Sequence, residues 1–352
     1  MLRNKIRVLI IDDSALVRKL LADGINRDPD LEVIGQAADP FVARDLIKKL
    51  NPDVLTLDVE MPRMDGVEFL RRMMPVHPLP VLMVSSLTGN GAQITLDALE
   101  AGALDFVTKP KADISRGLTA MLEDLTAKVK AVARTPVRKP QKLYQEINAE
   151  QKNLINHALA QTTDQVIAIG ASTGGTEALK EVLTTLPADS PGVVVVQHMP
   201  PGFTRLFAER LDKICQMKVK EAADQDRVMP GHILIAPGDY QMEVIRTGGL
   251  YRVRVFKGEN VNGHCPAVGV LFDSVARYAG KNAVGVILTG MGKDGAKELL
   301  TMKNAGARTI GQDKASCVVF GMPMEAFKIG AVDQLLPLNR IGAEIIELVG
   351  RK

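Results

Sequence analysis

Short apolar segments alternate with longer amphipathic segments over the first 130 residues of the chain. The apolar segments begin near Ile6, Leu31, Val54, Val81 and Leu104, at intervals of 23 to 27 residues. Helical patterns fill the intervals: one begins after Ser14, one begins with the cap residue Asp39 and Pro40, and others cover residues 66–74, 90–101 and 114–133. Five strands that alternate with five helices predict an open, doubly wound parallel sheet.

A second alternation of the same kind begins at Val166. Strands are expected at residues 166–169, 193–197, 218–221 and 284–288, and helices at 176–186, 204–214, 268–279 and 295–305. Residues 231–256 contain shorter apolar runs with turn residues at Pro237-Gly238 and Gly248-Gly249, which predict an antiparallel excursion. We therefore expect a mixed α/β sheet in this second domain.

A basic segment separates the two alternations. Residues 128–142 contain six Lys or Arg side chains, two prolines and no acid, a composition typical of a linker. A polar stretch with some helical character, residues 144–161, continues it. The expected organisation is therefore a first domain over residues 1–125, a linker over 126–162 and a second domain over 163–352.

Length and charge limit the classes of function. The chain has 352 residues, enough for two domains of ordinary size. Its net charge is +3, and because six positive charges lie in residues 128–142, the remainder of the chain carries −3. Nucleic-acid binding normally needs a larger basic excess, and 13 aromatic residues without any Trp offer few surfaces on which bases could stack.

The chain has the features of a cytoplasmic protein. Residues 1–5 lead into a strand pattern without the basic and apolar regions of a signal peptide. No apolar run approaches the roughly 20 residues that a membrane-spanning helix needs, so we expect no direct insertion into a membrane. Three widely separated cysteines, Cys215, Cys265 and Cys317, indicate neither a disulfide framework nor a zinc site.

Acidic side chains gather at the ends of the strands expected in the first domain. The first strand ends in Asp12-Asp13 and the third in Asp58, the fourth runs into Ser85, and Lys109 follows the fifth. The carboxyl ends of such strands share one crevice, where three carboxylates raise one another's pKa unless a cation compensates. Oxygen ligands of this kind suit Mg²⁺. The alternative is that each Asp only caps the helix that follows it.

In these residues the first domain resembles the receiver domain of bacterial response regulators. The resemblance covers residues 1–125 and is carried by Asp12-Asp13, the run DVEMPRMDG that begins at Asp58, Ser85 and Lys109-Pro110. It implies that a partner histidine kinase transfers a phosphoryl group to Asp58. It also implies that Mg²⁺ is held by Asp12, Asp13, Asp58 and the backbone carbonyl of Glu60, that Ser85 contacts the phosphoryl group, and that Lys109 neutralises it.

A glycine-rich turn follows the first strand expected in the second domain. Residues 170–175 read Gly-Ala-Ser-Thr-Gly-Gly and precede a helical pattern. In this position, G-x-S-x-G is typical of a nucleophile elbow, which would present Ser172. The alternative is a phosphate-binding loop, although residues 170–175 lack the Lys of a P-loop and the spacing of a dinucleotide fingerprint.

A base and an acid for Ser172 are expected at neighbouring strand ends. His198 directly follows the strand 193–197, whereas His232 and His264 lie near turns or strand starts and are weaker candidates. Asp294 lies in the glycine-rich loop after strand 284–288, where it could orient His198 or cap the next helix. Three strand ends that deliver Ser, His and Asp predict acyl transfer. Their order in the chain differs from that of α/β-hydrolases, which indicates another hydrolase lineage.

With these residues in view, the whole chain resembles the chemotaxis protein-glutamate methylesterases, a family that joins a receiver to a serine esterase. The matching segments of the second domain are residues 169–176, 197–201, 231–238, 288–295 and 312–326. The resemblance implies a catalytic triad of Ser172, His198 and Asp294, with the backbone amide of Met291 as an oxyanion donor and no cofactor for the esterase step. It implies γ-glutamyl methyl esters on methylated chemoreceptors as substrate, methanol as product, and deamidation of receptor glutamines as a second activity.

In the family's pattern, the unphosphorylated receiver covers the esterase site and phosphorylation relieves the block. Two alternatives remain open. One is a receiver joined to a DNA-binding output module, which would be a compact helical domain with a basic recognition helix rather than an α/β domain of about 190 residues. The other is a second domain that binds a nucleotide or a protein and performs no chemistry.

Overall fold

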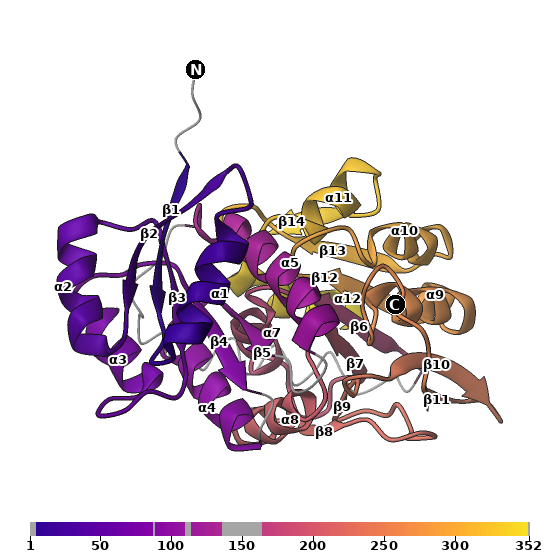
Figure 1. Cartoon of the computed structure of the whole chain (residues 1–352). Helices are drawn as coiled ribbons and strands as arrows, with labels where there is room; N and C mark the ends of the chain where they lie inside the picture. Colours follow the sequence, from indigo (N-terminus) through magenta and orange to yellow (C-terminus); the bar gives the residue numbers. More distant parts are fainter. Residues whose placement is uncertain (1–4, 87–88, 110–113, 136–163, 351–352) are drawn as a thin grey trace. The chain divides into compact units, whose positions relative to one another are not determined.

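The computed structural model describes residues 5–86, 89–109, 114–135 and 164–350. The chain divides into two compact units, residues 1–143 and 144–352. Figure 1 labels the helices and strands of both units. The predicted α/β class is confirmed in each of them.

The first unit is a five-stranded parallel sheet with a helix after each strand (Figure 1). Its strands are β1 (Ile6–Ile11), β2 (Leu31–Ala37), β3 (Val54–Asp58), β4 (Val81–Ser86) and β5 (Asp105–Lys109). Its helices are α1 (Ala15–Ile25), α2 (Pro40–Leu50), α3 (Gly66–Met73), α4 (Gly89–Glu100) and α5 (Ile114–Val132). The order β2-β1-β3-β4-β5 is that of a doubly wound sheet, as the hydrophobic pattern predicts.

Capping side chains set the start of two helices of this unit. The Ser14 hydroxyl accepts a hydrogen bond from the amide three residues later, at the start of α1. The Asp39 carboxylate accepts hydrogen bonds from the next two free amides of α2, and Pro40 occupies the first helical position, where no amide donor is needed. Both predicted helix starts are confirmed.

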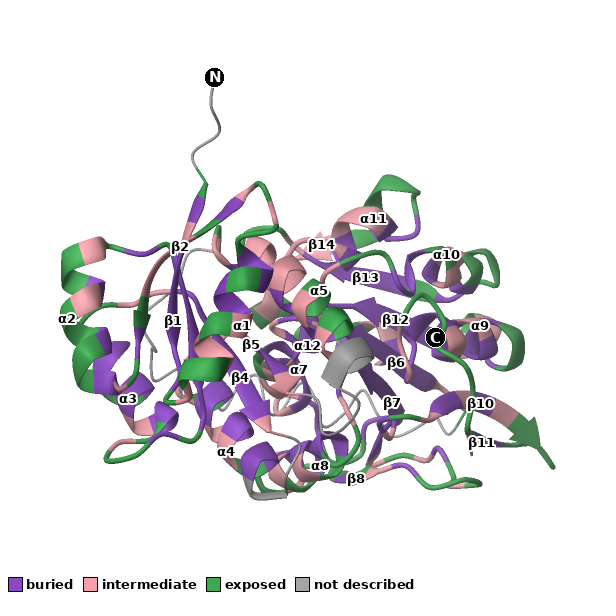
Figure 2. Ribbon diagram, in the orientation of Figure 1, coloured by how far each residue is buried: buried purple, intermediate pink, exposed green. Residues whose placement is uncertain are grey.

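One face of this sheet packs on α1 and α5. The core on that face contains Ile10, Val54 and Val84 from the strands, with Ile25 from α1 and Leu125 from α5. Figure 2 shows the strands as the most deeply buried part of the unit. Helix α5 extends to Val132, so that helix occupies the first residues of the segment 126–162 that is expected to be a linker. Residues 136–162 of that segment, with the polar stretch 144–161, lie outside the described residues.

The second unit contains a seven-stranded sheet in which every neighbouring pair of strands is parallel. Its strands are β6 (Val166–Ala171), β7 (Gly192–Gln197), β8 (Lys218–Glu221), β9 (His232–Ile235), β12 (Ala283–Ile287), β13 (Arg308–Gln312) and β14 (Gln334–Leu336). Its helices are α7 (Gly175–Leu183), α8 (Phe203–Ile214), α9 (Val268–Tyr278), α10 (Ala296–Asn304), α11 (Met322–Lys328) and α12 (Leu338–Gly350), with a 3₁₀ turn at Gly280–Asn282. The elements after Asn304 are additions to those that the sequence pattern predicts.

The antiparallel strands of this unit form a separate two-stranded sheet. Strands β10 (Gln241–Thr247) and β11 (Leu250–Phe256) pair through the predicted turn at Gly248-Gly249. The strand before them, β9, belongs instead to the large sheet, where it pairs in parallel with β7. The expected mixture of strand directions is therefore present in the unit, but it is divided between two sheets.

The strand order β14-β13-β12-β6-β7-β9-β8 places β6 between β12 and β7. From β6 the chain continues to β7 on one side of the sheet and returns much later to β12 on the other side. Open α/β sheets bind their ligands where the strand order reverses in this way, in the crevice outside the carboxyl ends of the strands. The segments that follow β12, β6 and β7 therefore form the expected place for a site.

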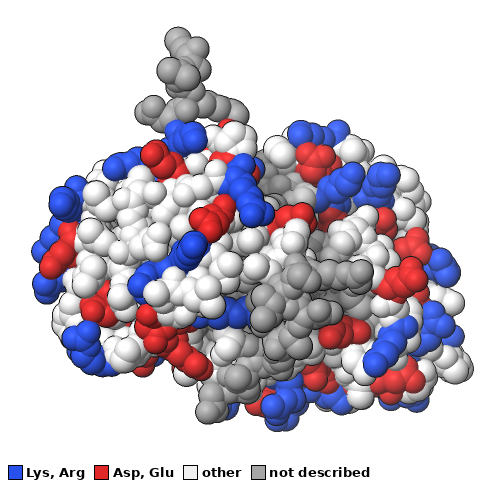
Figure 3. Space-filling model, in the orientation of Figure 1, with Lys and Arg blue, Asp and Glu red and all other residues white. Residues whose placement is uncertain are grey.

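Among the described residues, no helix is long and apolar enough to span a bilayer. On the face drawn in Figure 3, Lys and Arg side chains of the described residues alternate with Asp and Glu. A nucleic-acid-binding face would be dominated by positive charge instead.

Candidate functional site

The ends of β1, β3 and β5 bring two carboxylates and one ammonium group together in the first unit. Lys109 Nζ lies 2.9 Å from Asp12 Oδ2 and 2.9 Å from Asp58 Oδ1. Asp12 and Asp58 are buried, and together with the exposed Asp13 they offer carboxylate oxygens that lie within 4.8 Å of one another. These four predicted residues are therefore neighbours.

The charge balance of this acidic cluster favours a further cation. Burial is the main cause that raises the pKa of Asp58, to about 6; the Lys109 ammonium acts to lower it, and the charge of the neighbouring Asp12 adds to the increase. Burial also acts to lower the pKa of Lys109, but Asp58 and Asp12 outweigh it and the pKa is raised. One ammonium group therefore does not balance the negative charge of the three carboxylates. Hard oxygen ligands at this spacing suit a divalent cation such as Mg²⁺.

Ser85 lies close to the cluster in the sheet, and Glu60 lies close to it along the chain. Ser85 is on β4, next to Asp58 in the sheet, because Asp58 pairs with the preceding residue, Val84. Its hydroxyl accepts a hydrogen bond from Thr95 of α4 at 2.6 Å. Glu60 follows β3, and its side chain is exposed. The motif residue Pro110 lies outside the described residues.

In the second unit, Ser172 follows β6 in a tight turn that glycine makes possible. The Gly175 amide donates to the Ser172 carbonyl at 2.6 Å, and Gly174 has a φ of +76°, a conformation that glycine adopts without strain. The Ser172 amide donates to the carbonyl of Thr289 in the loop after β12. In that loop, a Cβ on Gly290 would lie 2.8 Å from the Ser172 Cβ, so the two loops touch.

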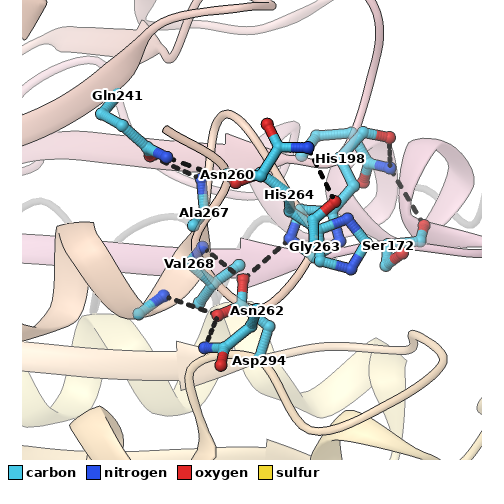
Figure 4. Close-up of polar contacts among 12 residues, drawn as sticks. Ser172, His198, Gln241, Asn260, Asn262, Gly263, His264, Ala267, Val268 and Asp294 are labelled. Atoms are coloured by element: carbon cyan, nitrogen blue, oxygen red, sulfur yellow. Dashed lines mark hydrogen bonds and ion pairs between the residues drawn. The ribbon is translucent and has the colours of Figure 1, made fainter. Parts of the chain in front are cut away.

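The His198 ring contacts Asp294 through a short hydrogen bond. The distance from His198 Nε2 to Asp294 Oδ2 is 2.9 Å, and both side chains are more than nine-tenths buried. His198 follows β7, and its amide donates to the carbonyl of Ala171 at the end of β6. The structure thus brings the predicted base and acid together, although 96 positions separate them in the chain. Figure 4 shows the His198 ring between Asp294 and Ser172.

Both carboxylate oxygens of Asp294 are fully hydrogen-bonded. Oδ2 also accepts from the Val268 amide at 2.7 Å, and Oδ1 accepts from the Gly269 amide at 3.2 Å and from Asn262 Nδ2 at 2.9 Å. Burial acts to raise the pKa of Asp294, but the hydrogen bonds from His198, Asn262 and Val268 outweigh it and the pKa lies below its usual value. The carboxylate therefore stays ionised beside the imidazole.

The orientation of the imidazole is the opposite of that in chymotrypsin-type triads, where Nδ1 faces the acid. Here Nε2 faces Asp294, and Nδ1 is a buried nitrogen with no hydrogen-bond partner among the described residues. A buried nitrogen with an unused lone pair is suited to take a proton from a nearby hydroxyl. The second nitrogen of His198 is therefore the one available to Ser172.

Three further side chains support this arrangement. The sequence indicates none of them in a supporting role, although it offers His264 as a weaker candidate for the base. Gln197 Nε2 donates to the carbonyls of Ser172 and His198, at 3.0 and 3.3 Å, and so ties together the ends of β6 and β7. Asn262 contacts Asp294, and the His264 ring stacks on the His198 ring with centroids 3.6 Å apart. Only the Asn262-Gly263 dipeptide carries a sequence signal, which is for a tight turn and not for a contact 32 residues away.

Met291 follows Gly290, whose backbone touches Ser172. The loop that carries both residues is fixed by Thr289, whose amide donates to Gln312 Oε1 at 2.8 Å and whose hydroxyl donates to the Thr173 carbonyl at 2.9 Å. The loop that carries Met291 thus lies next to Ser172. Donors in such a place can stabilise an oxyanion.

Comparison with known proteins gives a consistent result for both units. Residues 167–345 match the family model described as CheB methylesterase, and residues 8–130 match the response regulator receiver domain. A curated relative from Syntrophotalea carbinolica is named protein-glutamate methylesterase/protein-glutamine glutaminase. It is 58% identical over 348 residues, and the match covers 99% of each chain. One of the same name from Salmonella typhimurium is 54% identical over 343 residues, with 97% of each chain covered.

Among solved structures, the second unit is similar to the CheB methylesterase catalytic domain of Thermotoga maritima. The two are 41% identical with a TM-score of 0.52, and the match covers 53% of this chain and all of that one. Ser172, His198 and Asp294 all lie within residues 167–345, the segment that the CheB methylesterase family model matches.

Proposed function

Because the chain belongs to the CheB methylesterase family, with a receiver ahead of the esterase, we propose that Ser172, His198 and Asp294 are the residues that carry out its reaction. The chain is a protein-glutamate methylesterase and protein-glutamine glutaminase of chemotaxis, and its receiver places the enzyme under the control of phosphorylation. The observation that carries the proposal is the buried contact of His198 with Asp294 at the strand end next to Ser172.

In the proposed reaction, Ser172 Oγ attacks the carbonyl carbon of a receptor glutamyl methyl ester. His198 Nδ1 takes the serine proton as the new bond forms, and the imidazolium then gives it to the leaving methoxide, which departs as methanol. A water molecule attacks the acyl-serine in the same way and releases the receptor glutamate. With a glutamine side chain as substrate, ammonia leaves instead of methanol.

Asp294 and the loop after β12 act on the charges that develop. The ionised Asp294 fixes the tautomer in which Nε2 carries the proton and Nδ1 is free to accept one. It also stabilises the imidazolium that forms after proton transfer. We propose that the backbone amide of Met291 stabilises the negative charge that develops on the carbonyl oxygen of the ester. Met291 lies in the loop that contacts Ser172.

In the receiver, Asp58 is the proposed phosphoryl acceptor and a chemotaxis histidine kinase the donor. Its carboxylate lies in the acidic cluster with Lys109, which would neutralise one oxygen of the phosphoryl group, and Ser85 would contact another. Asp12, Asp13 and Asp58, with the main-chain carbonyl of Glu60, are the residues that would hold Mg²⁺. When bound, the ion would compensate the negative charge of the transferred group.

The proposed function is tested by methanol release from membranes that contain methylated chemoreceptors, with and without a small-molecule phosphodonor. We expect the protein to release methanol, and the phosphodonor to raise the rate. A folded protein that releases no methanol in either condition would contradict the proposal. Receptor glutamines offered in place of the methyl ester should yield ammonia.

Chelation of divalent cations should separate the two units in the same assay. With an excess of EDTA, we expect the stimulation by phosphodonor to disappear, because phosphoryl transfer to Asp58 needs a cation among Asp12, Asp13 and Asp58. The release measured without phosphodonor should persist, because the proposed proton transfers use the side chains of Ser172 and His198. Added Mg²⁺ should restore the stimulation. Equal loss of both rates would contradict the placement of the metal in the receiver alone.

A further inference from the structure

Gln241, the first residue of β10, is a buried amide whose hydrogen bonds all go to one loop. It is 2% exposed. Its Nε2 donates to the carbonyl of Glu259 at 3.0 Å and to that of His264 at 3.2 Å, and its Oε1 accepts from the Ala267 amide at 2.9 Å. One side chain thus binds the loop of residues 259–267 at its beginning, near its middle and at its end (Figure 4).

The loop that Gln241 holds makes both supporting contacts to the His198 and Asp294 pair. Its tip is a two-residue turn at Asn262 and Gly263, with φ of +54° and +86°, closed by hydrogen bonds in both directions between Val261 and His264. Positive φ at both central residues is the geometry of a type I′ turn, which Asn-Gly favours. On one side of this turn, Asn262 donates to Asp294 Oδ1, and on the other side the His264 ring stacks on His198 with an interplanar angle of 12°.

The end of the loop leads directly into the remaining donors to the acid. Ala267, whose amide is bound by Gln241, is the cap residue of α9, and the next two amides, those of Val268 and Gly269, both donate to Asp294. Of the four hydrogen bonds that Asp294 accepts from described residues, one comes from the loop that Gln241 binds and two come from the first two residues of α9, directly after the end of that loop. The fourth is the one from His198.

We propose that Gln241 is a positioning residue of the esterase reaction, which acts through residues 259–267 by fixing Asn262 on Asp294 and the His264 ring on the His198 ring. The ring stacked against His198 restricts rotation of the imidazole, and the donors to Asp294 fix the oxygen that receives Nε2–H. Together they direct Nδ1 toward Ser172. The inference rests on the triad proposed above.

The test is the variant Gln241→Met, which keeps the length of the side chain and removes its three hydrogen bonds. We expect kcat for methanol release to fall by about tenfold to 10²-fold, with KM unchanged, because the imidazole is misplaced while the substrate site is intact. The NMR signal of the hydrogen-bonded His198 Nε2 proton should broaden or shift. The folded fraction is followed by circular dichroism, since the chain has no Trp.

Ser274→Ala is the matched control. The Ser274 hydroxyl is also buried and also connects β10 to α9, because it accepts from the Val244 amide at 2.9 Å and donates to the Leu271 carbonyl at 2.7 Å. Neither of these hydrogen bonds involves residues 259–267. Its removal should lower the thermal stability while kcat at a temperature where the protein is folded stays at the parental value.

A second variant, Asn262→Ala, distinguishes positioning from a general loss of stability. Asn262 is exposed, so its replacement should change only the turn at residues 261–264, where alanine is less suited than asparagine to the positive φ, and should lower kcat by about tenfold. If Gln241 acts through this loop, the fold-loss of kcat in the double variant Gln241→Met, Asn262→Ala should be well below the product of the two single losses. In the double variant Ser274→Ala, Asn262→Ala, the two effects on kcat should instead multiply.

Parental kcat in a folded Gln241→Met variant, or multiplicative losses in the double variant, would overturn the proposal. If Gln241→Met does not fold, Asn262→Ala decides alone, and parental kcat in that variant overturns the role of the loop. Ser172→Ala, measured in parallel, keeps the two conclusions apart. An active Ser172→Ala variant refutes the triad, while an inactive one beside a fully active Gln241→Met variant refutes only the positioning role.

Discussion

Replacement of Ser172 by alanine should reduce methanol release from methylated receptors by about 10⁴- to 10⁶-fold, to the level that the remaining backbone donors and substrate binding support without a nucleophile. The reason is geometric. His198 Nδ1 is buried without a hydrogen-bond partner among the described residues, so it can take the proton that the proposed mechanism removes from the serine hydroxyl. The measurement is the initial rate of methanol release at saturating methylated receptor.

Ser190→Ala is the control for this experiment. Ser190 is a buried serine of the same unit, it precedes β7, and its hydroxyl has no partner among the described residues. Its replacement removes the same atom without touching the proposed triad, so we expect the parental rate. If Ser172→Ala also retains the parental rate, the nucleophile is another group, and the glycine-rich turn of residues 170–175 must be interpreted again as an anion-binding loop.

Replacement of Asp58 by asparagine should abolish all stimulation by phosphodonor and leave the unstimulated rate of methanol release in place. An amide is nearly the same size as the carboxylate, but it cannot accept the phosphoryl group. It also removes a negative charge beside Lys109, whose ammonium group lies 2.9 Å from Asp58. Two measurements check this: incorporation of labelled phosphate and the ratio of release rates with and without phosphodonor.

Asp53→Asn is the control for the receiver. Asp53 lies just before β3, at the opposite end of the strand from Asp58, and its Oδ2 accepts a hydrogen bond from the Arg7 amide at 2.8 Å. The asparagine can still accept that hydrogen bond, so labelling and stimulation should both persist. Stimulation that survives in Asp58→Asn would place the acceptor on another carboxylate.

Much of the fold was predictable because its signals are local. The period of the apolar segments identifies the alternating strands and helices of the first unit, and Ser14 and Asp39 mark helix starts through bonds to amides only two or three residues away. The strand β9 shows the limit of such reasoning. It is a short strand just before an antiparallel hairpin, and only its partners in space, β7 and β8, make it part of the parallel sheet.

The candidate site divides in the same way. Ser172, His198 and Asp294 follow three strands, and the rule that parallel strands end at one edge is enough to bring them together. That rule does not identify the residues that orient them. Asn262 and Gln241 act through a loop whose course depends on packing, and the choice of imidazole nitrogen depends on where the Asp294 oxygens lie. Neither the course of this loop nor the choice of nitrogen can be predicted from the periodicity or spacing of residues in the chain.

The central place of β6 in the large sheet has a consequence for synthesis of the protein. Ribosomes make the chain from its N-terminus, so β6 and β7 can pair as soon as Gln197 is available, whereas β12, the neighbour of β6 on its other side, begins at Ala283. Until then, the nascent chain presents one unpaired edge of a wholly apolar strand, the type of edge that aggregates. Asp294 comes later still, so a prematurely terminated chain would carry the serine and the histidine without their acid, and would be inactive.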